Sequence, residues 1–310
     1  MGIFYVPIGI AVLGMLIRYK SFSAPLKANW GLAKGGLFPE SKTGFVKRFP
    51  QDHPLLPSEI LLEGTLTLNE AKTRFDGFLK RMNQAQQVVL KPDDGIQGRS
   101  VYFVDSAEAF GTVWNKYIKG NGNWLLQEYV GGLEVAVFYL QDAPDKNGRI
   151  ASMTWKHGFE VTGDGRSSVE ALIHSAPGDE ATKRRVTKFN RDRLNDIVAA
   201  GESLDLIPVR NHHLGTTFQD ISDWITPELV AAICPMLDKF EGYNYGRLDI
   251  RAPDFNDLLA GKNIKILEAN ALYSEPVHAY DPKYGLAEAY RIFISYWNMA
   301  CKIGVRQKKI

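Results

Sequence analysis

Two carboxylates and an amide, Asp249, Glu268 and Asn270, lie near the ends of two short apolar segments. These segments, 245–251 and 263–269, have the length and composition of β-strands. Side chains two residues apart on a strand point to the same face, so Glu268 and Asn270 project together. Asp249 lies at the corresponding point if the two strands pair. Carboxylate and amide oxygens are hard ligands, suited to Mg²⁺ that also holds nucleotide phosphates. The spacing predicts a magnesium site, and the alternative is a surface ladder of cross-strand ion pairs.

Two arginines, Arg247 and Arg251, share the face that carries Asp249. Cations beside carboxylates suit a phosphate or an acyl-phosphate. The residues between them, Leu248 and Ile250, are apolar, which favours a sheet with a buried floor over a solvated one. We therefore predict that both arginines are catalytic.

A second candidate site begins at Lys91, which follows the apolar run 88–90 and precedes a loop containing Gly95 and Gly98. A further apolar run, 101–104, gives the order strand, glycine-bearing turn, strand. Polyphosphate is suited to a point charge together with backbone N–H groups that glycine lets come close. Many hairpins hold two glycines, so the prediction that Lys91 binds phosphate and acts in catalysis depends on the carboxylates further along the chain.

Glu134 follows the pair Gly131-Gly132 and begins another apolar run. A carboxylate in this place can bind ribose hydroxyls or a metal, and the alternative is a solvent-facing strand residue. The preceding segment, 126–130, is a candidate for an adenine slot, in which backbone N–H and C=O groups read the edge of the base.

The stretch 36–43 nearly matches a phosphate-binding P-loop. Ser41 replaces the second glycine, however, and no apolar strand precedes the stretch, so we exclude a P-loop. Lys42 remains a candidate for binding phosphate by another route.

The elements that must position these residues can be read from caps, turns and apolar periodicity. The predicted helices are 67–82, 105–118, 167–174, 180–200, 226–240 and 285–303, and the predicted strands are 87–91, 100–104, 124–130, 133–140, 150–155, 245–251 and 263–269. Because the strands come as antiparallel pairs mixed with helices, the pattern indicates an α+β fold.

The composition is that of an ordinary globular protein. The chain has 310 residues, enough for one large domain or two lobes, with 45% hydrophobic and 23% charged residues. A net charge of +2 gives no support for a nucleic-acid partner. The two cysteines, Cys234 and Cys301, imply no disulfide framework and fit a reducing cytoplasm, and no Cys/His cluster has zinc spacing.

The segment 2–17 has no charged side chain, and Arg18 and Lys20 follow it. It is shorter than the roughly 20 residues of a spanning helix, and it lacks the basic start and the cleavage site of a signal peptide. We expect residues 3–17 to form a helix that packs on the body or contacts the cytoplasmic membrane surface, rather than spanning it. Basic residues at the other end of the chain, Arg306 with Lys308 and Lys309, support the membrane-surface alternative.

The motifs described so far resemble, in order and spacing, those of the ATP-grasp superfamily. The similarity covers about 42–275 and rests on Lys42, the block 88–104, the stretch 127–134, Arg247 with Asp249, and Glu268 with Asn270. Local likeness extends to D-Ala-D-Ala-ligase-like and cyanophycin-synthetase-like members, the latter through 161–170 and through 201–208 leading to 220–223.

The resemblance implies a role for each matching residue. It implies phosphate binding by Lys42 and Lys91, closure of the loop 93–100 with Gly95 and Gly98, adenine binding by Gln127, Glu128, Tyr129 and Val130, ribose binding by Glu134, Mg²⁺ binding by Asp249, Glu268 and Asn270, and stabilisation of the transferring phosphoryl group by Arg247.

The resemblance also implies a fold and a reaction. We expect a segment 1–40, an N-terminal lobe 41–130 and a C-terminal lobe 131–310, the two α+β lobes gripping ATP and Mg²⁺. In the family's usual chemistry a carboxylate attacks the γ-phosphate, and the acyl-phosphate then takes an amine or thiol nucleophile. The expected partners are therefore a small-molecule acid and amine, and the sequence does not indicate an oligomeric state. The alternatives are a phosphotransferase on the same scaffold and a non-catalytic nucleotide-sensing module at a membrane.

The sequence also departs from the family. Such ligases usually begin with a separate substrate-binding domain, whereas only hydrophobic residues 1–41 precede Lys42 here. The substrates must then be held in another way, for which 211–215 and His278 are candidates. Asp93 and Asp94 make the glycine loop more acidic than a phosphate lid should be.

Overall fold

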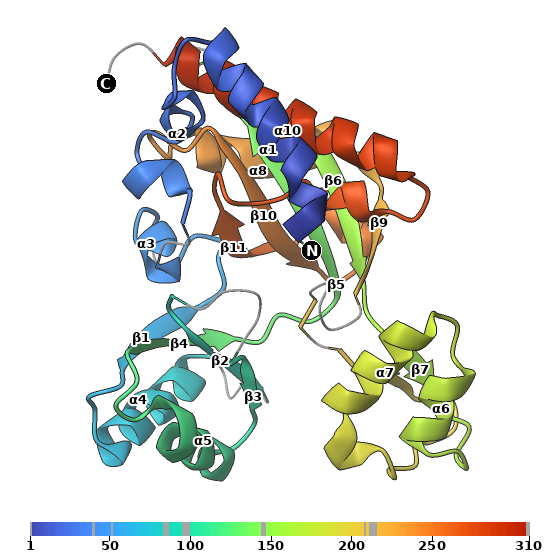
Figure 1. Cartoon of the computed structure of the whole chain (residues 1–310). Helices are drawn as coiled ribbons and strands as arrows, with labels where there is room; N and C mark the ends of the chain where they lie inside the picture. Colours follow the sequence, from blue (N-terminus) through green and yellow to red (C-terminus); the bar gives the residue numbers. More distant parts are fainter. Residues whose placement is uncertain are drawn as a thin grey trace.

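Two antiparallel sheets organise the chain, and each is the centre of a lobe in the computed structural model (Figure 1). The structure describes residues 2–38, 41–50, 52–82, 87–94, 100–143, 147–207, 209–210 and 216–307. The strands are β1 (Glu59–Glu63), β2 (Val88–Pro92), β3 (Tyr102–Val104), β4 (Asn123–Glu128), β5 (Leu133–Leu140), β6 (Arg149–His157), β7 (Glu160–Thr162), β8 (Ser203–Asp205), β9 (Thr217–Asp220), β10 (Tyr245–Ala252) and β11 (Lys265–Asn270). The helices are α1 (Gly2–Arg18), α2 (Ala24–Lys27), η1 (Ala33–Gly36), α3 (Lys42–Val46), α4 (Leu68–Arg81), α5 (Ala107–Val113), η2 (Trp114–Ile118), α6 (Val169–Ser175), α7 (Glu180–Phe189), η3 (Arg191–Arg193), η5 (Ser222–Trp224), α8 (Pro227–Asp238), α9 (Phe255–Leu259), η6 (Val277–Tyr280) and α10 (Leu286–Arg306).

The first lobe, residues 59–128, has the strand order β1-β4-β2-β3, with α4 and α5 packed against the sheet (Figure 1). Helix α4 begins at the predicted capping box. Thr67 Oγ1 accepts a hydrogen bond from the Glu70 N–H at 3.3 Å, and Glu70 Oε2 accepts from the Thr67 N–H at 2.8 Å. Strand β1, which adds to the predicted elements, pairs antiparallel with β4 and forms one edge of this sheet.

The second lobe is built on the sheet β11-β10-β5-β6-β9, whose two faces carry different helices. Along β5, Val135 and Val137 belong to the core that α8 completes, and Phe138 and Leu140 belong to the core that α10 completes. This alternation follows from the two-residue period of a strand. All pairings in the sheet are antiparallel, so the predicted α+β class is confirmed.

Strand β10 alternates in the same way and carries the charged residues of the candidate site. Leu248 belongs to the α8 core and Tyr245 to the α10 core. Arg247, Asp249 and Arg251 share the face of Tyr245 and continue it toward the start of β5, where the chain enters from the first lobe. The site therefore occupies the part of this face that the apolar residues of α10 leave open.

The segment before β1 packs on the second lobe rather than on the first. Phe45, Val46 and Phe49 contact the core that α8 completes, and Phe45 lies 5.7 Å from Phe240, between ring centroids. The division into 1–40, 41–130 and 131–310 stays a prediction, but this packing places residues around α3 with the second lobe.

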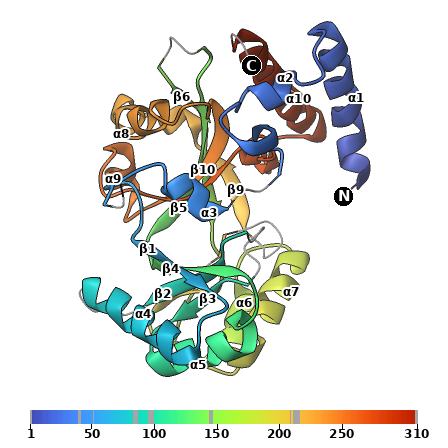
Figure 2. The same ribbon diagram turned by 90° about the vertical axis from the view of Figure 1, so that its left-hand side faces the viewer.

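Helix α1 confirms the expectation of a short helix that packs on the body. Ile8 is buried in the core formed with α10, and the Phe4 ring stacks on Tyr290 at 5.0 Å, between centroids. Figure 2 shows α1 at the periphery, on the outer side of α10. In the described part of the chain, no helix combines the length and hydropathy needed to cross a membrane.

A small unit, residues 159–207, contains β7, β8, α6 and α7 and has its own core, which includes Phe159, Ile173 and Val186. The predicted helix 180–200 is wrong beyond Phe189, where α7 ends. Asn190 stops it, because its side-chain amide donates both to the Val186 carbonyl and to the Leu206 carbonyl, at 2.9 Å each. Such side-chain bonds to the backbone compete with helix continuation.

Candidate functional site

The three predicted magnesium ligands come together on the second lobe. Strands β10 and β11 pair antiparallel with Asp249 opposite Glu268 and Arg247 opposite Asn270, which confirms the predicted pairing. The register shifts between Asp249 and Ile250, so Leu267 falls outside the pairing. Such a β-bulge redirects local groups and is frequent beside active sites.

Asp249 is buried and held by two cations. Arg247 donates from Nε to Asp249 Oδ1 at 2.9 Å and from Nη2 to Oδ2 at 3.2 Å, and Lys156 Nζ lies 2.9 Å from Oδ1. Burial raises the pKa of Asp249, but the charges of Arg247 and Lys156 outweigh burial and leave the pKa lowered. Asp249 is therefore ionised at neutral pH.

Glu134 is the second buried carboxylate of this face. Its Oε1 lies 3.0 Å from Lys156 Nζ, and its Oε2 accepts from Arg251 Nε at 3.0 Å. The strand register explains why both cations reach Glu134, since Arg251 of β10 and Lys156 of β6 both lie opposite Glu134 of β5. Arg251 also donates from Nη1 to the Val130 carbonyl at 2.6 Å, so it positions Glu134 and the end of the interlobe connection. A catalytic role for Arg251 and a ribose-binding role for Glu134 stay predictions.

Lys91 reaches from the first lobe to the second. Its Nζ donates to Gln127 Oε1 at 3.0 Å and to the carbonyl of Leu267, the bulged residue of β11, at 3.4 Å. The ammonium is buried, and desolvation lowers its pKa although Glu268 and Glu59 oppose the shift. Among the residues that the structure describes, this buried ammonium meets only neutral oxygens at hydrogen-bond distance, which suits it to an anionic ligand.

Lys42 lies beside Glu268, with 3.7 Å between Lys42 Nζ and Glu268 Oε1. Asp93 fixes this region, because its carboxylate accepts from the Thr43 N–H at 2.9 Å and from Ser41 Oγ at 2.6 Å. Its carbonyl also accepts from the Lys42 N–H at 3.0 Å. The acidity of Asp93 thus serves local structure, while Gly95 and Gly98 lie outside the described residues.

The predicted adenine segment, Gln127 to Val130, connects the lobes. Strand β4 ends at Glu128, two residues earlier than predicted, and Tyr129 is exposed, with its ring 5.8 Å from the Arg251 guanidinium. Gly132 follows with φ +89°, and a Cβ there would come within 2.1 Å of the Ala252 carbonyl oxygen. Only glycine fits this position.

A pocket opens beside Glu268, between the segment preceding β1 and strand β11. Apolar side chains make much of its wall, and Lys42, Glu59 and Glu268 supply its charges. The lining residues include Leu32, Phe45, Phe240, Tyr243, Ile266 and Tyr273. Burial raises the pKa of Glu59, which accepts from Gln127 Nε2 at 2.7 Å and so joins the pocket to Lys91.

The donor set fits a hard divalent cation. Asp249 and Glu268 supply carboxylates, and Glu268 keeps 32% of its side chain exposed. Asn270 is buried, its Oδ1 accepts from the Tyr273 hydroxyl, and its Nδ2 has no hydrogen-bond partner among the described residues. No group of three or more His, Cys, Asp and Glu that could bind a metal occurs in the described ranges, so the set depends on the amide of Asn270.

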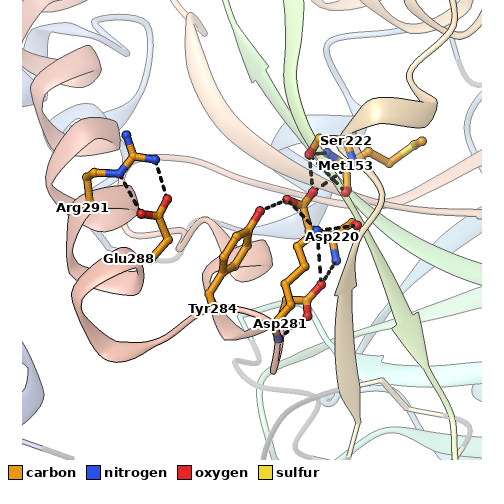
Figure 3. Close-up of polar contacts among 8 residues, drawn as sticks. Met153, Asp220, Ser222, Asp281, Tyr284, Glu288 and Arg291 are labelled. Atoms are coloured by element: carbon orange, nitrogen blue, oxygen red, sulfur yellow. Dashed lines mark hydrogen bonds and ion pairs between the residues drawn. The ribbon is translucent and has the colours of Figure 1, made fainter.

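His278, a predicted substrate-binding candidate, is buried on η6, and the other candidate, 211–215, lies outside the described residues. A polar cluster beside His278 holds η6 against β9 (Figure 3). Asp220 accepts from the Tyr284 hydroxyl at 2.5 Å and from the Ser222 N–H at 2.9 Å, and its own N–H donates to Asp281 at 2.7 Å. Nδ1 of His278 has no partner within the described part of the chain, and burial lowers the His278 pKa.

Sequence reasoning missed two charged residues of the site. Lys156 lies within a strand that was predicted only to Trp155, and it is the cation that bridges Glu134 and Asp249. The strand also contains Ser152 and Thr154 on the same face, so no local pattern marked Lys156 as a residue of the site. Glu59 lies on β1, which was not predicted.

Comparison with known proteins supports the fold. No family model matches the sequence, and no curated protein matches it. Among solved structures, D-alanine–D-alanine ligase from Bacillus anthracis is similar with a TM-score of 0.52 and 14% identity, over 88% of this chain and 69% of that chain.

Two further solved structures are similar with lower scores. A bifunctional glutathione synthetase from Pasteurella multocida has a TM-score of 0.41 and 17% identity, over 82% of this chain and 36% of that chain. The ATP-grasp ligase PsnB has a TM-score of 0.41 and 11% identity, over 83% of this chain and 60% of that chain. The chain thus spans about a third of the synthetase and about two thirds of the D-alanine–D-alanine ligase.

Proposed function

We propose that this chain, which has the ATP-grasp fold that the sequence resemblance implied, is a Mg-ATP-dependent ligase. It would activate a small carboxylic acid as an acyl-phosphate and join it to an amine or a thiol. One observation carries the proposal. Lys91 of the first lobe donates to the carbonyl of Leu267, the bulged residue of β11 that precedes Glu268. Glu268 in turn lies opposite Asp249, which Arg247 and Lys156 hold. The lysine proposed for phosphate and the carboxylates proposed for Mg²⁺ therefore lie together, although they come from two lobes.

The proposed nucleotide site follows from this arrangement. Lys42 and Lys91 neutralise phosphate oxygens, and Gln127 to Val130 frame the adenine. Glu134 binds the ribose hydroxyls when its ion pairs with Lys156 and Arg251 loosen. Asp249, Glu268 and Asn270 would hold Mg²⁺, which neutralises phosphate charge and orients the phosphoryl group for in-line transfer. Arg247 and Lys156 keep Asp249 ionised and supply positive charge beside the transferring group.

The reaction then needs little covalent participation by the protein. A substrate carboxylate oxygen bonds to the γ-phosphorus, the bond to the bridging oxygen breaks, and ADP leaves. The amine attacks the carbonyl carbon of the acyl-phosphate, inorganic phosphate leaves, and the amine proton passes to solvent or to a nearby base. The cations Lys42, Lys91, Lys156 and Arg247 stabilise the charge that develops on phosphate oxygens.

In the proposed reaction the substrate acid must lie next to the groups that hold the phosphates and Mg²⁺, because its carboxylate attacks the γ-phosphorus. The pocket beside Glu268 has an apolar wall that suits a hydrocarbon body, and Lys42 in its lining would pair with the carboxylate of a small acid. His278 and the pocket residues are the candidates for holding the acid and the amine.

A substrate screen tests the proposal. The protein is incubated with Mg-ATP and pairs of amino acids and small acids, and ADP, inorganic phosphate and the organic product are measured together. We expect one pair to give ADP, phosphate and an amide in equal amounts. A stable phosphorylated product would mark a phosphotransferase, and ADP release that no substrate stimulates would contradict the ligase proposal.

A further inference from the structure

Helix α1 presents an apolar face to solvent that no part of the described chain covers. The residues Ile3, Val6, Ile10, Leu13 and Ile17 are 89%, 58%, 68%, 52% and 62% exposed. Their spacing of three and four residues places them in one stripe along the helix. The opposite side of α1, with Phe4, Ile8 and Val12, is the side that packs on α10. An exposed stripe of this length is a docking surface rather than a feature of a solvated helix.

No charged residue of α1 borders the stripe, and its polar neighbour near the start of the helix is the Tyr5 hydroxyl, which donates to Glu275 at 2.5 Å. No charged residue occurs from Gly2 to Ile17. The glycines of this helix, Gly9 and Gly14, face open space, because nothing lies within 4 Å of a Cβ added at either position. A helix that pairs with a second copy usually flanks its apolar seam with charged residues that set the partner's register. The uncharged arc of α1 instead suits a continuous apolar medium.

The charged groups at the C-terminal end of the stripe are cations. Arg18 and Lys20 are exposed where α1 ends, and Lys302 and Arg306 are exposed on the last turns of α10. The two helix ends lie together, because the Tyr19 hydroxyl donates to Asn298 at 2.8 Å. An apolar stripe with a cationic end matches a bilayer surface that contains anionic lipids.

We propose that α1 docks the protein on an anionic membrane surface, with the helix lying in the plane of the interface. Its 17 residues span about 25 Å, less than the roughly 30 Å hydrocarbon core, so it lies along the surface. The buried side of α1 stays on α10, and Ile3, Val6, Ile10, Leu13 and Ile17 enter the lipid.

Vesicle flotation of the full chain tests this proposal. We expect flotation with vesicles of phosphatidylcholine and about one third phosphatidylglycerol, and about tenfold weaker binding to phosphatidylcholine alone. Raising the salt from about 0.1 M to 0.5 M should weaken binding to the anionic vesicles and leave binding to phosphatidylcholine alone unchanged. An absence of flotation with the anionic vesicles would overturn the proposal.

Paired variants identify the surface. Ile10→Glu should lower vesicle binding about tenfold or more, because the side chain leaves water on docking. The control, Ile197→Glu, alters a 54% exposed isoleucine in the small unit and should change binding less than twofold. The double variant Arg18→Gln with Lys20→Asn should weaken binding to anionic vesicles about tenfold and to neutral vesicles not at all.

Folding and self-association are measured on the same samples. The unfolding temperature of Ile10→Glu should lie within a few degrees of that of the wild type. If Ile10→Glu does not fold, Leu13→Glu is used in its place. Unchanged flotation of either variant would contradict docking through α1. If sedimentation shows a wild-type dimer that Ile10→Glu makes monomeric, while no vesicle binds, a second copy occupies the stripe and the membrane proposal is wrong.

Discussion

Glu268 and Asp249 are cross-strand partners, yet their surroundings differ. Asp249 is buried and holds Arg247 and Lys156, whereas Glu268 is one-third exposed and has Lys42 at 3.7 Å. Asp249 is thus fixed before any ligand binds, and Glu268 is the carboxylate that remains available to one. Loss of charge at Glu268 should therefore affect chemistry more than folding.

Glu268→Gln should lower kcat about 100-fold or more, because a neutral amide is a weaker ligand for Mg²⁺ and cannot balance the charge of the metal as a carboxylate does. The unfolding temperature should stay near that of the wild type. Glu63→Gln is the control, since Glu63 also pairs with a cation, Arg74, but lies in the first lobe away from the site. Activity of Glu268→Gln within a few-fold of the wild type would show that the metal assignment is wrong.

Lys91→Met should weaken Mg-ATP binding about tenfold or more, since it removes the buried ammonium that faces the interlobe site. Calorimetric titration measures this affinity. Lys183→Met is the matched control, because Lys183 also donates to a backbone carbonyl, that of His174 at 2.8 Å, but within the small unit. Equal ATP affinities for Lys91→Met and the wild type would remove Lys91 from the nucleotide site.

The residues that sequence alone could identify are those whose position follows from the strand period. Asp249, Glu268 and Asn270 needed only two paired strands to meet, and β10 and β11 do pair. Lys156 could not be identified from the sequence. Its place opposite Glu134 depends on the register of β5 with β6, which no local pattern encodes.

At the scale of elements, η6 and β9 are joined by a polar cluster that has no counterpart in the sequence pattern (Figure 3). Asp220 and Asp281 make its bonds, and His278 is buried beside them. Most of the longer helices and strands were predictable from caps and apolar runs, whereas the short elements α3, β7 and α9 were not predicted. Strand β1 and the end of α7 depended on partners distant in the sequence.

The buried His278 gives a pH dependence with a definite sign. Burial lowers its folded-state pKa below the ordinary value of 6.5, so the unfolded chain binds more protons below that pH. Stability from this group is full above pH 6.5 and is lost as pH falls toward the folded-state pKa. The unfolding free energy should therefore decrease between about pH 7.5 and 5.5.

His278→Gln should make that decrease smaller, as measured by urea unfolding at each pH. The exposed His174 provides the comparison, and His174→Gln should leave the slope of stability against pH as it is in the wild type. If the two variants have the same slope, burial of His278 does not set it.

At the scale of the whole molecule, two lobes meet at one charged site, and a third small unit packs separately. The connection runs through Tyr129 to Gly132, where the glycine lies against the Ala252 carbonyl oxygen. The two-lobed architecture could be expected from the resemblance, but the packing of residues around α3 on the second lobe could not. That packing brings Lys42 to Glu268, although Lys42 precedes the first lobe in sequence.

The central claim is that a carboxylate is activated by phosphorylation, and isotope transfer tests it most directly. The acid selected by the substrate screen is labelled with ¹⁸O in its carboxylate and incubated with Mg-ATP, the amine and the protein. If an acyl-phosphate forms, one labelled oxygen passes from the acid to the inorganic phosphate, which mass spectrometry detects. Unlabelled phosphate, or label retained in a stable organic phosphate, would contradict the account.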